Sequence, residues 1–216
     1  MDNQFTCYAF AAVPPFAQGL VRDLRVRWAL EEAELPYHVA LVGGGTGAVS
    51  PADYAAIQPF GQIPALRHGD LTMFESGAIV LHVAEQSRAL LPSEPQARAH
   101  VQQWMFAALN TVESPVQELA GLDLFHAGAG WAAERRPAVE ERVRQRLAQL
   151  TACLKDGEYL VGAFSAADIL MASVLRILRH TELVAEQPRL LAYLRRCEAR
   201  PAFRRALEGQ MAAFAA

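Results

Sequence analysis

Every segment with the pattern of a β-strand lies before a short proline-bearing stretch at residues 91–95, and the chain after that stretch has helical patterns only. Such a change across a proline-bearing segment is typical of a domain boundary. The 216 residues of the chain are enough for two domains of roughly 80 to 130 residues each. We therefore expect an α/β domain at residues 1–87 and an all-helical domain at residues 96–216.

The first part of the chain predicts a strand–helix–strand unit followed by a hairpin. Residues 4–11 mix aromatic and β-favouring residues ahead of two prolines, which predicts a strand and then a loop. Apolar residues at three- and four-residue spacing around Val26 predict a helix, and residues 37–42 predict a second strand. Residues 65–68 and 71–74 flank a Gly-Asp turn and predict a hairpin. This order predicts a single small mixed sheet with helices on both faces.

The other segments of the chain have the N-cap residues and the apolar periodicity of helices. Ser50 precedes a proline, and its side chain is placed to accept a hydrogen bond from the backbone N–H of Asp53 at the start of a short helix. Ser76 opens an apolar stretch that predicts a longer helix. Beyond residue 95, apolar residues recur at helical spacing, and the nearly all-apolar residues 169–177 predict a buried central helix.

Charge and hydropathy exclude two classes of partner. The 20 basic and 23 acidic side chains give a net charge of -3, and neither sign gathers into a block, which argues against a nucleic-acid partner. The basic residues at positions 22–27 are a local exception, and their helical spacing predicts that most of them form a solvated face. No apolar run approaches the roughly 20 residues that cross a bilayer, so no membrane partner is expected.

The cysteines and the N-terminus indicate a cytoplasmic protein. The three cysteines are widely separated and form neither a C-x-x-C pair nor a metal-ligand spacing, so we expect no bound metal. The N-terminal residues run directly into strand-like sequence without the pattern of a secretory signal.

Three local motifs resemble segments of the glutathione transferase family. Residues 58–66 (Gln-Pro-Phe-Gly-Gln-Ile-Pro-Ala-Leu) resemble the segment that leads into the third strand of these proteins, where the proline is cis. Residues 74–79 (Phe-Glu-Ser-Gly-Ala-Ile) resemble the family's glutamate-serine pair before the third helix. Residues 164–169 resemble the capping box of the family's buried helix, with Ser165 and Asp168 exchanging hydrogen bonds. Their joint order implies the glutathione transferase fold, a thioredoxin-like α/β domain followed by an all-α domain.

The resemblance also implies a site for glutathione, which the family uses as a co-substrate. A cis peptide at Pro64 would let the main-chain N–H and C=O of Ile63 pair with an extended peptide ligand, and Gln62 lies beside them. The carboxylate of Glu75 suits the ammonium group of the γ-glutamyl end, and the hydroxyl of Ser76 with the helix N–H groups suits its carboxylate. Ser76 taken alone fits a simple helix cap better than a ligand contact, and its place downstream of Ile63-Pro64 favours the ligand role.

The sequence does not identify a single residue that would activate the glutathione thiol. Family members use Tyr, Ser or Cys near the end of the first strand or the start of the first helix, yet residues 11–19 contain none of the three. Tyr8 is the nearest hydroxyl of the right type, and Arg22, near the helix start, is placed to stabilise a thiolate by charge. Two alternatives stay open: backbone N–H groups of the loop, and a mixed disulfide between Cys7 and glutathione.

The activity that the resemblance implies is conjugation of the glutathione thiolate to a small hydrophobic electrophile. The electrophile would lie between the two domains, with Phe16, Phe106 and Asn110 as candidate contacts. Two alternatives share the same binding half: glutathione-dependent isomerisation or reduction of a disulfide or peroxide, and a non-catalytic binding module. The resemblance further implies a homodimer.

Overall fold

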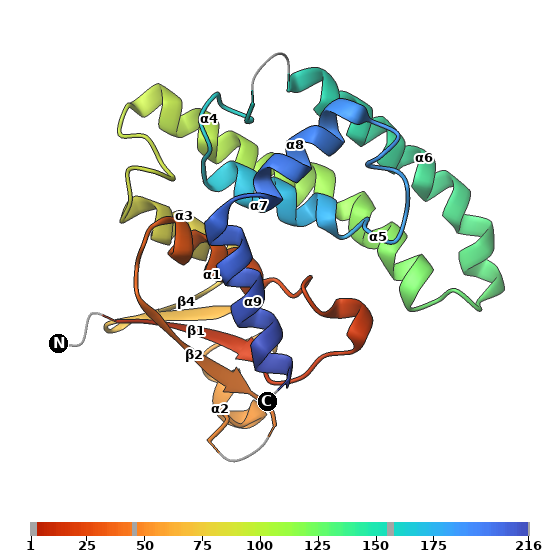
Figure 1. The fold of residues 1–216 in the computed structure, drawn as a ribbon. Helices are drawn as coiled ribbons and strands as arrows, with labels where there is room; N and C mark the ends of the chain where they lie inside the picture. The colour runs from red at the N-terminus through yellow and green to blue at the C-terminus, as the bar shows by residue number, and fades with distance from the viewer. Residues whose placement is uncertain (1–3, 45–46, 155–157, 216) are drawn as a thin grey trace. The chain divides into compact units, whose positions relative to one another are not determined.

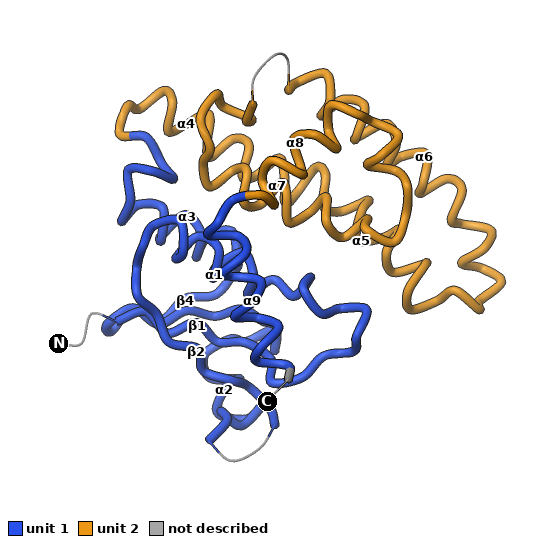
Figure 2. Tube along the Cα trace, in the orientation of Figure 1, with its two compact units in different colours: residues 1–92, 200–216 blue, residues 93–199 orange. Residues whose placement is uncertain are grey.

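The computed structural model divides the chain into two compact units. The residues that it describes are 4–44, 47–154 and 158–215. Unit 1 comprises residues 1–92 and 200–216, and unit 2 comprises residues 93–199 (Figure 2). The fold class is as predicted, because unit 1 holds a thioredoxin-like mixed sheet with its helices and unit 2 is helical. The last helix belongs to unit 1, whereas the sequence division places it in the helical domain.

The sheet of unit 1 has the strand order β2-β1-β3-β4. Figure 1 labels β1, β2 and β4. β1 pairs in parallel with β2 and antiparallel with β3, and β3 pairs antiparallel with β4. Parallel neighbours need a crossover connection, and helix α1 supplies it between β1 and β2. The strands are β1 (Phe5–Phe10), β2 (Tyr37–Val42), β3 (Ala65–His68) and β4 (Leu71–Phe74).

Apolar side chains are buried between the helices and the sheet of unit 1. Trp28, Leu30, Leu66 and Ile79 are among the largest fully buried side chains of the described residues. The short helix α2 begins as predicted, since the hydroxyl of Ser50 accepts a hydrogen bond from the backbone N–H of its third following residue at 3.1 Å. The elements are the 3-10 turn η1 (Pro15–Ala17) and the helices α1 (Asp23–Glu32), α2 (Pro51–Ala55), α3 (Ser76–Glu85) and α9 (Pro201–Ala215).

Helix α9 packs against α1 on the sheet-bearing unit (Figure 1). The rings of Trp28 and Phe203 meet edge to face with their centroids 4.8 Å apart. At the preceding turn, the guanidinium of Arg200 forms two hydrogen bonds to the carboxylate of Glu32, at 2.6 and 2.7 Å. The chain therefore returns from unit 2 to complete the core of unit 1.

Unit 2 is built around the buried helix α7. Its predicted capping box is present, with Ser165 as the N-cap and Asp168 bonded back to it. The carboxylate of Asp168 also accepts hydrogen bonds from the N–H of Leu160 and the hydroxyl of Tyr193, each at 3.0 Å. Among the described residues, no helix is long and apolar enough to traverse a membrane. The elements are α4 (Pro95–Phe106), the π-helical turn η2 (Ala107–Val112), α5 (Glu113–Leu124), α6 (Gly130–Cys153), α7 (Ala166–Arg176) and α8 (Pro188–Glu198).

Candidate functional site

The peptide bond between Ile63 and Pro64 is cis, as the motif at residues 58–66 predicts. It lies immediately before β3, and the side chain of Ile63 is buried. Within the described part of the chain, neither the N–H nor the C=O of Ile63 has a hydrogen-bond partner. A buried residue with both main-chain groups unpaired offers a short strand edge to a ligand, because buried backbone groups are nearly always paired.

The loop before this edge is held by two side chains. The buried amide oxygen of Gln58 accepts hydrogen bonds from the N–H groups of Phe60 and Gln62, at 2.6 and 3.2 Å. The hydroxyl of Tyr54 donates to the C=O of Gln62 at 2.8 Å. The main chain of Gln62 is therefore already paired within the protein, and only its exposed side chain remains for a ligand.

Glu75 and Ser76 lie beside the cis-proline edge. The antiparallel pairing of Ala65 with Phe74 brings the residues just before β3 next to those just after β4. Glu75 is the N-cap residue of α3, with a φ of 70°, and its side chain is exposed. The residues predicted to bind glutathione thus gather where β3 begins and β4 ends, together with the N-terminus of a helix.

Ser76 is not a simple cap. It occupies the first helical position after the N-cap, and its hydroxyl accepts a hydrogen bond from Nη1 of Arg25 at 3.2 Å. Both side chains are buried. A buried guanidinium behind a helix N-terminus adds positive charge where the helix dipole is already positive, which favours a bound carboxylate.

The burial of Arg25 and Arg27 corrects the prediction of a solvated basic face. Nε of Arg27 donates to the carboxylate of the buried Asp23 at 2.7 Å. Periodicity could not find this arrangement, because a buried arginine has the same spacing as an exposed one. The sequence feature that indicates burial is the set of apolar residues on α1 that flank both arginines.

Tyr8 lies in β1 and is buried. Its ring packs against Tyr54 with centroids 5.8 Å apart, in a cluster that also contains Ile63 and Ala65. Tyr8 therefore lies in the same apolar cluster as the residue before the cis-proline. Its catalytic role stays a prediction.

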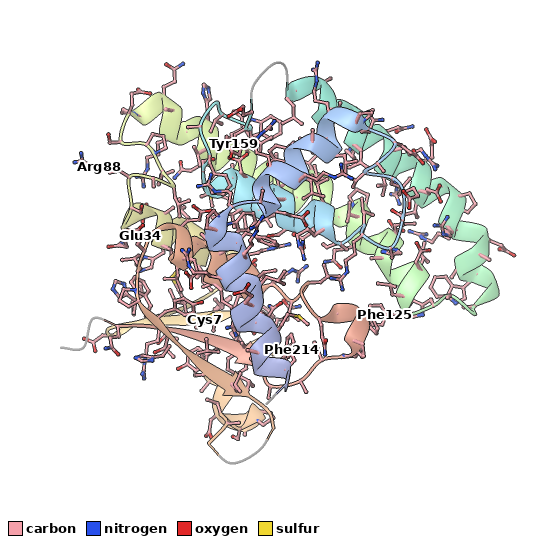
Figure 3. The ribbon with its side chains drawn as sticks, viewed as in Figure 1. Cys7, Glu34, Arg88, Phe125, Tyr159 and Phe214 are labelled. Carbon is pink, nitrogen blue, oxygen red and sulfur yellow. The ribbon has the colours of Figure 1, made fainter. Side chains whose placement is uncertain are left out.

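Cys7 precedes Tyr8 in β1 and therefore faces the opposite side of the strand. Figure 3 labels Cys7 within unit 1, and its side chain has no exposed surface. Burial, followed by the nearby charge of Asp23, raises the pKa of the Cys7 thiol far above its ordinary value, and Arg27 offsets only part of this effect. A thiol that is both inaccessible and protonated cannot form the mixed disulfide considered above.

The loop between β1 and α1 carries the other candidates of unit 1. Arg22 is half-buried and is the N-cap residue of α1. Phe16 lies in η1 and has 38% of its surface exposed. The loop at residues 11–22 contains no Ser, Thr, Cys or Tyr, so Tyr8, Arg22 and loop N–H groups remain the candidates for thiol activation.

Phe106 and Asn110 belong to unit 2. Phe106 ends α4 with 64% of its surface exposed, and Asn110 is exposed in η2. The π-helical turn precedes Pro115, whose missing N–H removes the α-helical partner of the C=O of Thr111. π-helical turns are frequent at functional sites, but the role of Phe106 and Asn110 as substrate contacts stays a prediction.

Fold and site together define a class of protein: a thioredoxin-like domain with an unpaired main-chain segment beside a cis-proline, followed by a helical domain. The N-terminal domain model of glutathione S-transferases matches residues 18–85, and the C-terminal domain model matches residues 124–201. A glutathione S-transferase of Hyoscyamus muticus is 29% identical over 86% of this chain and 92% of the relative. Glutathione S-transferase 3 of Zea mays is 31% identical over 84% of this chain and 86% of the relative. The chain belongs to the glutathione S-transferase family, and it is therefore a transferase.

A solved structure shares the fold at the level of the whole chain. A glutathione transferase family member from Pseudomonas fluorescens, crystallised with two glutathione molecules bound, superposes with a TM-score of 0.82. It is 23% identical and covers 95% of this chain and 93% of its own.

Among the described residues, no group of three or more His, Cys, Asp or Glu side chains is arranged to hold a metal ion.

Proposed function

We propose that this protein binds glutathione at the cis-proline edge and conjugates its thiolate to a small hydrophobic electrophile. The observation that carries the proposal is the unpaired main chain of Ile63 beside the exposed Glu75 and the N-terminus of α3. The glutathione bound to the structural neighbour from Pseudomonas fluorescens supports the choice of ligand.

Each part of glutathione has a complementary group at this edge. Its cysteinyl N–H and C=O pair with the C=O and N–H of Ile63 in a strand-like manner. The γ-glutamyl ammonium group binds the carboxylate of Glu75, and the γ-glutamyl carboxylate accepts from the hydroxyl of Ser76 and the free N–H groups of α3. Nη1 of Arg25 lies 3.2 Å from the hydroxyl oxygen of Ser76, and the charge of the guanidinium favours the same anion.

Activation of the thiol needs only modest stabilisation of the thiolate. Lowering a thiol pKa by two units corresponds to about 2.7 kcal/mol, which one cation or a few oriented donors can supply. Arg22 at the start of α1 and the loop N–H groups are suited to this role, and the hydroxyl of Tyr8 is the side-chain donor of the same region. The thiol loses its proton to solvent, and the thiolate attacks the electrophilic carbon. A bond from sulfur to carbon forms while the bond from that carbon to the leaving group breaks, and the leaving group departs with its electron pair.

The binding step is tested by isothermal titration of glutathione into Glu75→Ala. Loss of a charge-assisted hydrogen bond costs about 1.5–3 kcal/mol, so we expect the affinity to fall about 10- to 100-fold. Glu34→Ala is the matched control, because Glu34 is also an exposed glutamate with positive φ. Glu34 follows the C-terminal end of α1, whereas Arg22 lies at the N-terminal end of that helix. Equal affinity in the wild-type and Glu75→Ala proteins would refute the proposed site.

The reaction type is tested by product analysis with an aromatic halide, a disulfide and a peroxide, each supplied with glutathione. A thioether product supports conjugation, and oxidised glutathione from the disulfide or peroxide supports reduction. A protein that binds glutathione and accelerates none of these reactions fits the non-catalytic alternative. Comparing Tyr8→Phe with Arg22→Leu in the productive assay identifies the group that activates the thiol.

The family resemblance also motivates a homodimer and a cytoplasmic location as parts of this proposal. Sedimentation velocity measures the first, and fluorescence microscopy of the tagged full chain measures the second.

A further inference from the structure

A buried glutamine on the last helix contacts the loop that leads into α1. The side chain of Gln210, on α9, has no exposed surface. Its amide nitrogen donates to the C=O of Val21 at 3.1 Å and to the carboxylate of Asp23 at 2.6 Å. Both acceptors lie where the loop after β1 becomes α1, so one amide group fixes this junction.

A second polar contact, between Asp23 and Arg27, stabilises this junction between the loop and α1. Asp23 is buried, and its other carboxylate oxygen accepts from Nε of Arg27, one turn along α1, at 2.7 Å. Burial raises the pKa of Asp23, and the hydrogen bonds from Arg27 and Gln210 offset only part of that effect. Hydrogen bonds among buried polar groups are costly to leave unmade, so the geometry of this cluster is specific.

The junction adjoins the candidate site on two sides. Val21 packs against the apolar cluster that contains Tyr8 and Ile63. Arg22 is the next residue in the chain and is the N-cap residue of α1. The position of the loop end relative to the cis-proline edge therefore depends on the contacts of Gln210.

We infer that Gln210 is a positioning residue for the thiol end of bound glutathione. This inference rests on the proposed function and adds to it a role for the C-terminal helix. The groups proposed to bind the γ-glutamyl end follow β4 and lie in α3, and the main-chain edge precedes β3. The hydrogen bonds of Gln210 reach none of these groups. It holds instead the segment that carries Arg22 and the loop N–H groups, which are proposed to stabilise the thiolate.

Gln210→Met tests the inference, because methionine keeps the buried volume and removes both hydrogen bonds. Displacement of a reacting group by about 1 Å can cost 100-fold in rate, so we expect kcat to fall about 10-fold or more. The dissociation constant and KM for glutathione should change by less than about 3-fold, since the binding edge is untouched. The pKa of the bound thiol, followed by thiolate absorbance, should rise. Glu208→Met is the matched control, because Glu208 is exposed on the same helix.

Three outcomes overturn the inference. Gln210→Met overturns it if stability falls while kcat and the thiol pKa stay at the wild-type values, or if affinity for glutathione falls as much as kcat. If Gln210→Met does not fold, Gln210→Asn replaces it, since the shorter amide cannot reach both acceptors, and the same criteria apply. Wild-type protein that does not bind glutathione overturns the proposed function and this inference with it, so the two failures are distinguishable.

Discussion

Two glutamates adopt backbone conformations that favour glycine. Glu34 has a φ of 55° just after α1, and Glu75 has a φ of 70° just before α3. A positive φ brings the Cβ of an L-residue close to its own carbonyl oxygen and costs roughly 1–2 kcal/mol. At Glu34 the strained residue only ends a helix. At Glu75 the same strain fixes the direction of a carboxylate at the candidate site, which is where such strain is commonly stored.

Substituting glycine for Glu34 and for Glu75 distinguishes an effect on the free energy of unfolding from an effect on glutathione affinity. We expect Glu34→Gly and Glu75→Gly each to raise the free energy of unfolding by about 1 kcal/mol, because glycine adopts positive φ without a Cβ clash. Only Glu75→Gly should lose affinity for glutathione. Urea denaturation and isothermal titration measure the two effects. A loss of affinity in Glu34→Gly, or none in Glu75→Gly, would contradict the assignment.

The three cysteines should differ in reactivity towards a thiol reagent. Cys7 and Cys197 are buried and Cys153 is exposed. Burial holds the Cys7 thiol in its protonated form, and only a thiolate reacts. Native protein should therefore release about one equivalent of chromophore from an aromatic disulfide reagent, and Cys153→Ser should release almost none. Rapid reaction of native Cys153→Ser would show that Cys7 or Cys197 is accessible.

At the scale of elements, a histidine pair links the interior strand β3 to α3. Nδ1 of His68, on β3, lies 3.0 Å from Nε2 of His82, on α3. The ring of His68 also stacks on Phe5 of β1, with centroids 3.9 Å apart. One nitrogen of the histidine pair donates and the other accepts, so the contact requires at least one neutral ring.

The pair should make stability depend on pH below neutrality. Burial first, and then the charge of His68, lower the pKa of His82, while Glu85 acts in the opposite direction. In the unfolded chain His82 binds a proton near its ordinary pKa of about 6.5, so below that pH the unfolded state binds more protons than the folded state. The stability from this contact is complete above about pH 6.5 and is lost as the pH falls towards the lowered pKa of the folded state.

We expect the wild-type protein to lose more unfolding free energy than His82→Gln between about pH 7.5 and about pH 5. Urea denaturation of both proteins at a series of pH values gives the difference. Parallel pH profiles would show that His82 does not contribute to the acid sensitivity.

At the scale of the whole molecule, the first and last helices of unit 1 depend on each other. Phe203 of α9 packs on the fully buried Trp28 of α1. Removing a buried aromatic ring leaves a cavity and costs about 3–5 kcal/mol, so Phe203→Ala should strongly destabilise unit 1. Met211→Ala, at an exposed position on α9, should have a much smaller effect. Hydrogen exchange of the β1 and α1 amides measures the stability of this unit, and equal exchange in both variants would contradict the dependence.

Local patterns in the sequence predicted the secondary structure closely. The predicted strands at residues 37–42, 65–68 and 71–74 coincide with β2, β3 and β4. The predicted caps at Ser50 and Ser165 form as expected, because capping depends on residues two or three positions apart. The cis peptide before Pro64 followed from a family resemblance, since the residues alone leave the isomer undecided.

Contacts between residues far apart in the sequence could not be predicted from these local patterns. The sequence by itself determined which segments become strands and helices and where the candidate ligand edge begins, because spacing and caps act over a few residues. Only the tertiary structure decided that α9 belongs with α1, that Arg25 and Arg27 are buried, and that Gln210 reaches Val21 and Asp23. Helical periodicity shows that a face is apolar and cannot name its partner, which depends on how a distant part of the chain returns to the core.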